Sequence, residues 1–262
     1  QDMNLVDHYT FSSSNFIYSM NETDDGLFVI GTLSDLFFFD RPKNEFIQCK
    51  LISGNSVLES ARINASFKDS YGWHWIGTTI VKKGLFYQKP ESQKVINFHQ
   101  ITQYPLDHSD IRDFYEDKKG VIWVATNGGG IYLLKPENRD SLYFEKFEEE
   151  GAIPLLLNTL TIFADHNGFL WFGGFNGLTR YSPKDGSIKH FNSGNGLEAD
   201  AIYDIEGDGR YLWLSSNKGL LRFEPIAPQE TKVKIMELSD GIPFEDIYTY
   251  DIYRSREGMI HV

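Results

Sequence analysis

Residues 117–134 read DKKGVIWVATNGGGIYLL, and this segment contains most of the information about the fold. Asp117 and Gly120 mark an acidic turn, because glycine adopts positive φ at little cost and an Asp side chain can bond the backbone two residues on. An apolar segment around Trp123 follows and ends in a pair of small residues. A glycine turn then leads into the apolar residues 130–133. Two short apolar segments joined by a turn predict a β-hairpin.

The same pattern recurs along the whole chain. The aromatic position that anchors each copy is found at 28, 75, 123, 171, 213 and 261, so successive anchors are 42 to 48 residues apart. Each copy has one more apolar segment before the acidic turn, such as 111–115. A fourth segment, such as 143–147, follows the proline that closes the third. Four short strands in a unit of this length are typical of a β-propeller blade.

We therefore predict an all-β protein in which residues 1–262 form a single β-propeller of four-stranded blades. Six repeat anchors are visible, and the last blade is predicted to be truncated after its anchor near position 261. No segment is predicted to be a helix. The aromatic anchors should pack between blades, and the small residues behind them should let neighbouring blades approach closely. This periodic role accounts for an aromatic content of 15%.

Composition excludes several classes of function. The net charge of −12 and the absence of a basic stripe argue against nucleic acid as a partner. No run of 18 apolar residues occurs, so we expect no membrane contact by this segment. The single cysteine, Cys49, cannot form an internal disulfide and is interpreted as a strand residue.

Signatures of metal, cofactor and catalytic sites are also missing from the sequence. The seven histidines are scattered about once per blade without a ligand pair, so no metal and no cofactor are predicted. Sialidase-type propellers carry Asp and Gly two residues apart, whereas Asp69 and Gly72 here are three apart. The repeated acids are therefore interpreted as turn residues, and no catalytic residue is predicted.

The repeat resembles the two-component regulator propeller repeat. The resemblance rests on the acidic turn, the Trp-x-Gly-Thr pattern of residues 75–78 and the Gly-Leu-x-x-Phe pattern of residues 219–223. Residues 193–203 and 240–246 are similar to connections between blades in that family. The resemblance implies the periplasmic sensor region of a hybrid two-component histidine kinase, as found in gut Bacteroidetes that respond to glycan breakdown products. It also implies a neighbouring propeller or an Ig-like domain in the same protein. The kinase signature boxes are absent, so the segment itself is predicted not to be an enzyme.

A ligand site is predicted on one face of the propeller. The turns between the second and third strands lie on the same face as the connections between blades, and together they surround the central channel. The turns contribute the candidates Asn127, Phe175, Asn176 and Asn217, and the connections contribute His108, Asn158 and Asp200. Asn side chains donate and accept hydrogen bonds and an aromatic face stacks on a sugar ring, so an oligosaccharide is the predicted small-molecule ligand. Asn is also common in turns for backbone reasons alone, which leaves a structural role open.

Three hypotheses about function follow. The first is an extracytoplasmic, periplasmic ligand-sensing propeller of a two-component signalling protein, which could act as a homodimer. The second is a carbohydrate-active lyase or hydrolase. The third is a scaffold propeller that binds only protein.

Overall fold

The computed structural model describes most of the predicted repeats. It describes residues 17–22, 27–33, 35–40, 43, 45–49, 52–53, 56–57, 62–79, 84–90, 92, 94–98, 106, 110–148, 153–225, 232–236, 252–254 and 260–261. The candidate His108 lies outside these residues, as does most of the segment expected to form the inner strand of the sixth blade.

Five antiparallel four-stranded sheets form five blades. Blade one contains β1 (Ile17–Glu22), β2 (Leu27–Thr32), β3 (Leu36–Asp40) and β4 (Glu45–Cys49). Blade two contains β7 (Ile63–Lys68), β8 (His74–Thr78), β9 (Leu85–Gln88) and β10 (Val95–Asn97). Blade three contains β11 (Ile111–Glu116), β12 (Ile122–Thr126), β13 (Gly130–Leu134) and β14 (Phe144–Lys146). Blade four contains β15 (Thr159–Ala164), β16 (Leu170–Gly174), β17 (Gly177–Tyr181) and β18 (Ile188–Phe191). Blade five contains β19 (Ile202–Gly207), β20 (Leu212–Ser216), β21 (Gly219–Glu224) and β22 (Lys232–Ile235).

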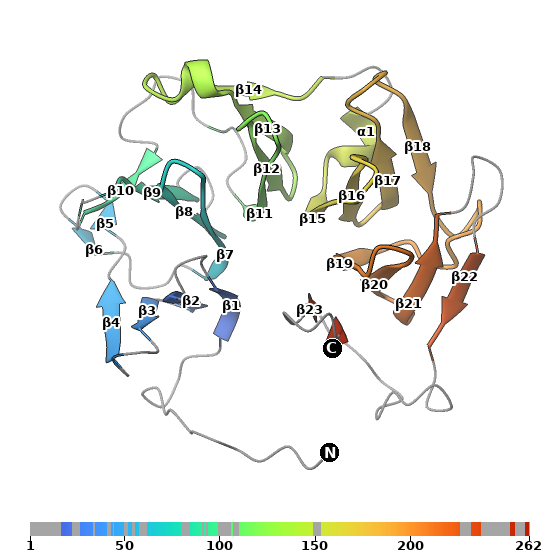
Figure 1. The fold of residues 1–262 in the computed structure, drawn as a ribbon, viewed down its shortest axis with the longest axis horizontal. Helices are drawn as coiled ribbons and strands as arrows, with labels where there is room; N and C mark the ends of the chain where they lie inside the picture. The colour runs from blue at the N-terminus through green and yellow to red at the C-terminus, as the bar shows by residue number, and fades with distance from the viewer. Residues whose placement is uncertain are drawn as a thin grey trace, which may run out of the picture.

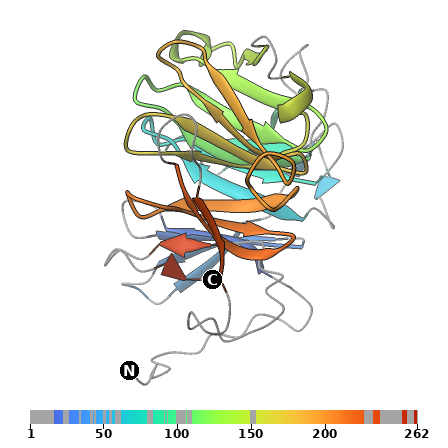
Figure 2. The same ribbon diagram turned by 90° about the vertical axis from the view of Figure 1, so that its right-hand side faces the viewer.

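Two further hairpins accompany the blades. The first is formed by β5 (Ile52–Ser53) and β6 (Ser56–Val57), and the second by β23 (Tyr253–Arg254) and β24 (Ile260–His261). The second hairpin carries the sixth anchor position and lies beside β19 in both ribbon views (Figure 1, Figure 2).

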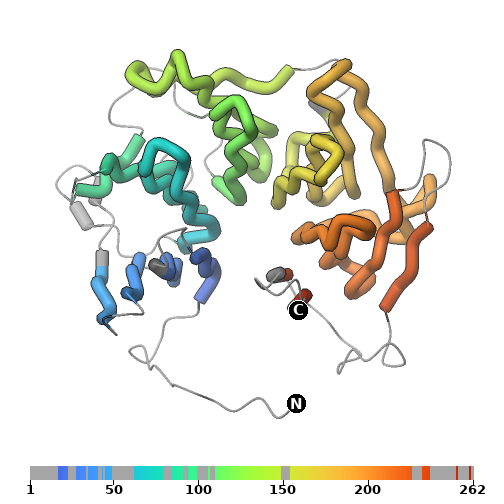
Figure 3. The backbone as a smooth tube through the Cα atoms, in the orientation of Figure 1, coloured from blue at the N-terminus to red at the C-terminus, as the bar shows by residue number. Residues whose placement is uncertain are grey.

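The blades are arranged around a central axis, with the first strand of each blade innermost (Figure 1, Figure 3). The inner strands β1, β7, β11, β15 and β19 contact one another in chain order. The second strands supply much of the core, since Trp75 and Trp171 are fully buried. The prediction of an all-β propeller with four-stranded blades is confirmed.

The prediction that the chain has no helix is wrong in two short places. A 3-10 turn, η2 (Pro136–Asn138), follows β13, and a single α-helical turn, α1 (Ile153–Leu156), precedes β15. Proline has a fixed φ that suits the first turn of a helix, and each of these turns begins at or next to a proline. Such short turns carry no hydrophobic periodicity, so the sequence pattern could not reveal them.

The acidic turns take the predicted conformation. Gly72, Gly120, Gly168 and Gly209 have φ between 76° and 93°. The Asp165 Oδ1 atom accepts the N–H of Asn167 at 2.8 Å, and the three other turns repeat this bond. The sequence did not reveal the partner of the second carboxylate oxygen. In blades two to five this second oxygen, Oδ2, accepts the indole N–H of the anchor Trp, as from Trp171 Nε1 at 2.9 Å. The acid therefore orients the aromatic ring that packs between blades.

The small residues behind the anchors form the joints between blades, as predicted. A Cβ added to Gly77 would lie 2.6 Å from Cγ2 of Ile111, the first residue of the next inner strand. The same close approach joins Gly31 to Ile63 and Gly173 to Ile202. Neighbouring blades interlock through these contacts, and the packing determines where the inner strands lie around the axis.

Candidate functional site

The turns and connections chosen from the sequence lie next to one another. The backbone N–H of Asn127 donates to the Asp110 carbonyl at 2.9 Å, and Asn127 also forms a β-bridge with Asn158. The N–H of Phe175 donates to the Asn158 carbonyl at 3.2 Å. The structure therefore brings the second turn of blades three and four together with the connections that flank them, on one face of the ring.

Three of the candidate Asn side chains hold a turn against a connection. Asn127 Nδ2 donates to Asp110 Oδ2 at 3.0 Å, and Asn176 Nδ2 donates to the Pro154 carbonyl at 3.2 Å. Asn217 Oδ1 accepts the N–H groups of Asp200 and Ala201 at 3.3 and 3.2 Å. These bonds give the Asn residues a structural role, and contact with a ligand stays a prediction for each of them.

Two other candidates present different chemistry. Asp200 Oδ1 accepts the Ser193 N–H at 3.2 Å, and hydrogen bonds from Ser193 hold the pKa of the Asp200 carboxyl below its usual value. Asp200 therefore stays charged at neutral pH. The Phe175 side chain is 47% exposed at the tip of its turn. It is available for contact with a ligand or with another protein surface.

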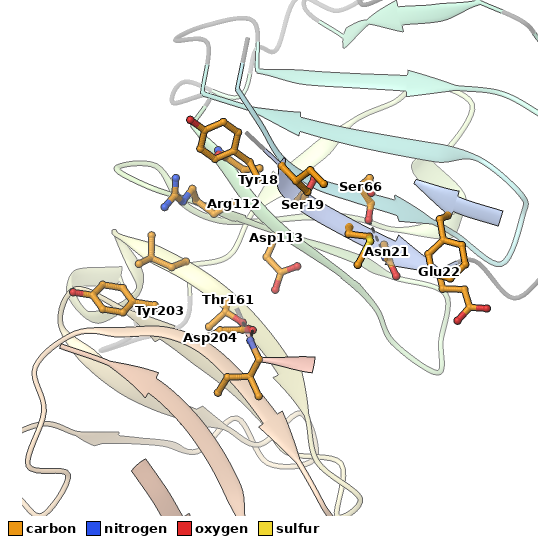
Figure 4. Close-up of a pocket in the computed structure, with 17 residues that line it drawn as sticks. Tyr18, Ser19, Asn21, Glu22, Ser66, Arg112, Asp113, Thr161, Tyr203 and Asp204 are labelled. Atoms are coloured by element: carbon orange, nitrogen blue, oxygen red, sulfur yellow. Dashed lines mark hydrogen bonds between the residues drawn. The ribbon is translucent and has the colours of Figure 1, made fainter. Parts of the chain in front are cut away.

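A cavity, the central channel, lies on the axis of the blades, and its lining residues were not among those predicted from the sequence. It has a volume of about 580 Å³, and its lining comes from all five inner strands together with Phe28 and Ile252. Figure 4 shows Asp113, Thr161 and Asp204 pointing toward this space from β11, β15 and β19. A cavity of this size at the axis is a suitable place for a small ligand.

The mouth of the channel is formed by bulged residues. In every inner strand the pairing register shifts between the first and third residues, so the second residue is unpaired. Bulges re-aim a side chain and are common beside functional sites. The bulged residues are Tyr18, Asn64, Arg112, Leu160 and Tyr203, and all of them line the cavity. Figure 4 shows Tyr18, Arg112 and Tyr203 at the same end of the channel.

A polar network connects this mouth to the predicted turn residues. Arg62 Nε donates to Asn64 Oδ1 at 2.8 Å, and Asn64 Nδ2 donates to Asp110 Oδ1 at 3.1 Å. Arg112 Nη1 lies 3.6 Å from the same Asp110 oxygen, whose partner oxygen accepts from Asn127. The Arg62 guanidinium also lies over the Tyr18 ring, 4.8 Å from its centroid. The mouth therefore combines cationic donors, a carboxylate acceptor, amides and an aromatic face.

The acids deeper in the channel are engaged by the backbone. Asp113 Oδ2 accepts the Ile162 N–H at 2.7 Å, and Asp204 Oδ2 accepts the Ile252 N–H at 2.6 Å. Thr161 Oγ1 donates to Asp204 Oδ1 at 3.0 Å. Each acid joins its own blade to the next one. They act as structural acceptors between neighbouring repeats.

The residues of the mouth can be located from the repeat in the sequence. Each of them follows the first residue of an inner strand, so the repeat period locates them one by one. Their side chains differ in chemistry from blade to blade, and this variation hid them among strand residues. A ligand site built on a repeat needs such variation, because it must recognise an asymmetric molecule.

Two other kinds of feature are absent from the described part of the chain. No group of three or more His, Cys, Asp or Glu side chains there could hold a metal ion. None of the helices formed by these residues has the length and apolarity needed to cross a membrane.

Comparison with known proteins confirms the resemblance seen in the sequence. Residues 105–128 match the family model described as the two component regulator propeller. The chain is 25% identical over 257 residues to histidine kinase P4 of Formosa agariphila, and the match covers 88% of this chain. The matched model is that of the regulator propeller repeat which the sequence pattern resembles. The chain spans only 17% of the length of that curated relative.

Solved structures share the fold. The extracellular domain of BT3049 from B. thetaiotaomicron, assigned as a hybrid two component system, superposes with a TM-score of 0.78 at 21% identity. That match covers 97% of this chain and 33% of the solved one. Virginiamycin B lyase from Staphylococcus aureus superposes with a TM-score of 0.61 at 13% identity, covering 84% of this chain and 70% of the lyase. Because sensors and a lyase share this fold, the fold alone does not select a function.

Proposed function

We propose that this regulator propeller is the ligand-sensing module of a two-component signalling protein, and that it binds a neutral oligosaccharide at the mouth of its central channel. The observation that carries the proposal is the set of bulged residues around the cavity of about 580 Å³. Four different blades contribute polar or aromatic side chains to this one opening. Small-molecule sites commonly occupy cavities of roughly 300 to 1,000 Å³.

The chemistry of the mouth suits a polyhydroxylated ligand. A sugar hydroxyl both donates and accepts, so it can bond a guanidinium and a carboxylate at the same time. Arg112 and Asp110 offer that combination 3.6 Å apart, and Asn127 adds an amide beside them. The rings of Tyr18 and Tyr203 supply apolar faces on which the C–H groups of a sugar ring can pack.

Charge decides between a neutral and an acidic sugar. The charged residues that line the cavity are Glu22, Asp113 and Asp204 against a single Arg112. At the mouth, the Asp110 carboxylate lies 3.6 Å from Arg112 and is linked to Arg62 through Asn64. An acidic oligosaccharide would enter a region with excess negative charge, so a neutral one is favoured.

The site also provides a way to produce a signal. Tyr18, Asn64, Arg112 and Tyr203 come from blades one, two, three and five. A ligand that contacts all of them binds best to one arrangement of the blades, and a ligand shifts an equilibrium only through such differential binding. In the complete protein, the propeller would pass this change to a neighbouring propeller or Ig-like domain, or across a homodimer.

An extracytoplasmic and specifically periplasmic location belongs to the same proposal. It is supported by the solved relative, which is an extracellular domain of a two component system. The lyase hypothesis is less well supported, because the channel acids Asp113 and Asp204 are held by backbone N–H groups.

The test is a binding screen with a matched pair of variants. The chain is titrated with neutral and acidic oligosaccharides by calorimetry, and each mixture is then analysed chromatographically for products. We expect one neutral oligosaccharide to bind without turnover. Tyr203→Ala should weaken binding by about tenfold or more through loss of the stacking face. Tyr143→Ala, a change at an exposed tyrosine next to β14, should leave affinity unchanged.

Three results would count against the proposal. Equal affinity of the Tyr203→Ala and Tyr143→Ala variants for the oligosaccharide would show that it does not bind at the channel mouth. Tighter binding of acidic sugars than of neutral ones would contradict the charge argument. Product formation would replace the sensor with the enzyme hypothesis.

A further inference from the structure

One row of polar residues crosses the sheet of blade two next to its acidic turn. Lys68 on β7 pairs with His74 on β8, and His74 pairs with Gln88 on β9. Residues directly opposite each other on neighbouring strands share one face of the sheet, so these three side chains lie side by side. They face blade one, because the Phe38 ring of β3 meets the His74 ring edge-on, with 5.6 Å between the ring centroids.

The same row is apolar in the next three blades. The positions equivalent to His74 and Gln88 hold buried aliphatic or aromatic residues there, namely Ile122 and Leu134, Leu170 and Tyr181, and Leu212 and Phe223. In blade two, His74 and Gln88 are only partly buried. Blade two therefore carries hydrogen-bonding side chains at positions where the repeat otherwise gains stability from apolar burial.

The polar row lines a cavity of about 360 Å³, which we call the blade-two pocket. Lys89 and Ser92, from the turn that follows β9, contribute to the same lining. The Gln88 side chain fixes this turn against the sheet, since its Nε2 atom donates to the Ser92 carbonyl at 2.5 Å. The pocket thus collects side chains from three strands and one turn.

The charge of the blade-two pocket is positive. Lys68 and Lys89 line it, and none of the described lining residues is an acid. The acid next to Lys68 in the sequence, Asp69, is buried and forms its ion pair with Arg139 of blade three. The Lys89 ammonium lies over the Trp73 ring, 4.9 Å from its centroid, and an aromatic face carries no net charge that could cancel that of the lysine. A cationic pocket in a chain of net charge −12 indicates a site for an anion.

We propose that the blade-two pocket binds a phosphate or sulfate group. The two lysine ammonium groups match the two negative charges of such a group, whereas a single carboxylate would neutralise only one of them. The pocket also holds an imidazole, an amide and a hydroxyl, all of which can donate hydrogen bonds. Hydrogen bonds from charged donors to an anionic oxygen are stronger than bonds between neutral groups.

This pocket is separate from the mouth of the central channel. Asn64, which lines the channel, is the second residue of β7, and Lys68 is the last residue of the same strand. At about 3.3 Å per residue, these two positions are about 13 Å apart along the strand. The inference therefore does not rest on the proposed function, and Tyr203→Ala should leave binding of the anion unchanged.

The experiment is thermal unfolding of the chain in increasing concentrations of inorganic phosphate or sulfate, with the ionic strength held constant by sodium chloride. We expect the melting temperature to rise and then to saturate with each of these anions, but not with acetate or chloride. Lys89→Gln should weaken the apparent affinity about tenfold or more, because a charge-assisted hydrogen bond is lost. Lys119→Gln, at an exposed lysine in the acidic turn of blade three, should leave the affinity unchanged.

A second variant separates loss of binding from loss of the fold. His74→Leu introduces an aliphatic residue like those at this row in blades three to five. In chloride it should melt at the temperature of the wild type or above it, because it buries more apolar surface. Its melting temperature should no longer respond to phosphate as that of the wild type does.

Four results would overturn the inference. Phosphate and sulfate also stabilise folded proteins by exclusion from the surface, and an equal rise in the wild type, Lys89→Gln and His74→Leu would assign the effect to that exclusion. Equal stabilisation by acetate would contradict a site for a doubly charged anion. A wild-type melting temperature that neither anion changes would show that the pocket binds neither of them. Loss of the response in Tyr203→Ala would place the anion at the channel mouth.

Discussion

At the scale of single residues, His190 shows how burial sets the charge state of a side chain. The Nδ1 atom of His190 on β18 lies 2.9 Å from the Oγ1 atom of Thr179, which is its pairing partner on β17. Burial lowers the pKa of the His190 imidazole below its usual value of 6.5. The folded protein therefore favours the neutral ring, whereas the unfolded chain binds the proton more readily.

A pH dependence of stability follows from this shift. Because the folded pKa of His190 is depressed, its contribution is complete above pH 6.5 and is lost as the pH falls through that value toward the folded pKa. The free energy of unfolding should decrease between about pH 7.5 and pH 5, and His190→Gln should reduce that decrease. Urea unfolding at the two pH values measures the difference. The exposed His166→Gln variant is the control, and an equal effect of both substitutions would contradict the role of burial.

At the scale of elements, the joint between adjacent blades is the recurring unit. The contact of Gly77 on β8 with Ile111 on β11 leaves no room for one more methyl group. Small-to-large changes in a packed interior cost about 1 to 3 kcal/mol, because side chains must leave their rotamers or the backbone must shift. The complementary shape of the two residues thus determines the spacing of the blades.

We predict that Gly77→Ala lowers the free energy of unfolding by about 1 to 3 kcal/mol. Adding Ile111→Ala should cost less in the Gly77→Ala background than in the wild type, since the introduced methyl group occupies part of the vacated space. A double-mutant cycle by urea unfolding measures this coupling. Gly194→Ala, in an exposed turn, should change stability little. Strict additivity of the two substitutions would argue against direct packing.

At the scale of the whole molecule, a buried ion pair connects blades two and three through residues 70 positions apart in the sequence. Arg139 follows η2 in blade three, and its guanidinium forms an ion pair of 2.5 Å with Asp69 in the acidic turn of blade two. Both side chains are almost fully buried, and the guanidinium also lies 3.9 Å from the centroid of the Tyr71 ring. Losing one partner of such a pair leaves a buried charge uncompensated.

Arg139→Ala should therefore destabilise the protein by about 3 to 5 kcal/mol. The matched control is Arg210→Ala, which removes an ion pair to Glu224 from a side chain that is 70% exposed. That change should cost about 0 to 1 kcal/mol. Thermal or urea unfolding of both variants gives the comparison. Similar losses in the two variants would show that burial of the Asp69 pair contributes little.

The sequence by itself determined the architecture, and the reason is that the blade is a local structure. Its turns depend on Asp and Gly a few residues apart, and its strands alternate at short range, so the repeat could be found without tertiary information. Six anchors, the closing prolines and the glycine joints all follow from that period. The face formed by the second turns and the connections follows from the topology of a four-stranded blade.

Only the tertiary structure decided which side chains surround the channel. Tyr18, Arg112 and Tyr203 are separated by some 90 residues at each step of the chain, and they meet because five inner strands converge on one axis. The tertiary structure also showed that the side chains of Asn127 and Asn217 form hydrogen bonds with the connections between blades. It showed in addition that Ile17 and Met20 are exposed. These facts depend on contacts between blades, which no local pattern contains. The repeat therefore specifies the blade, while packing between blades specifies the site.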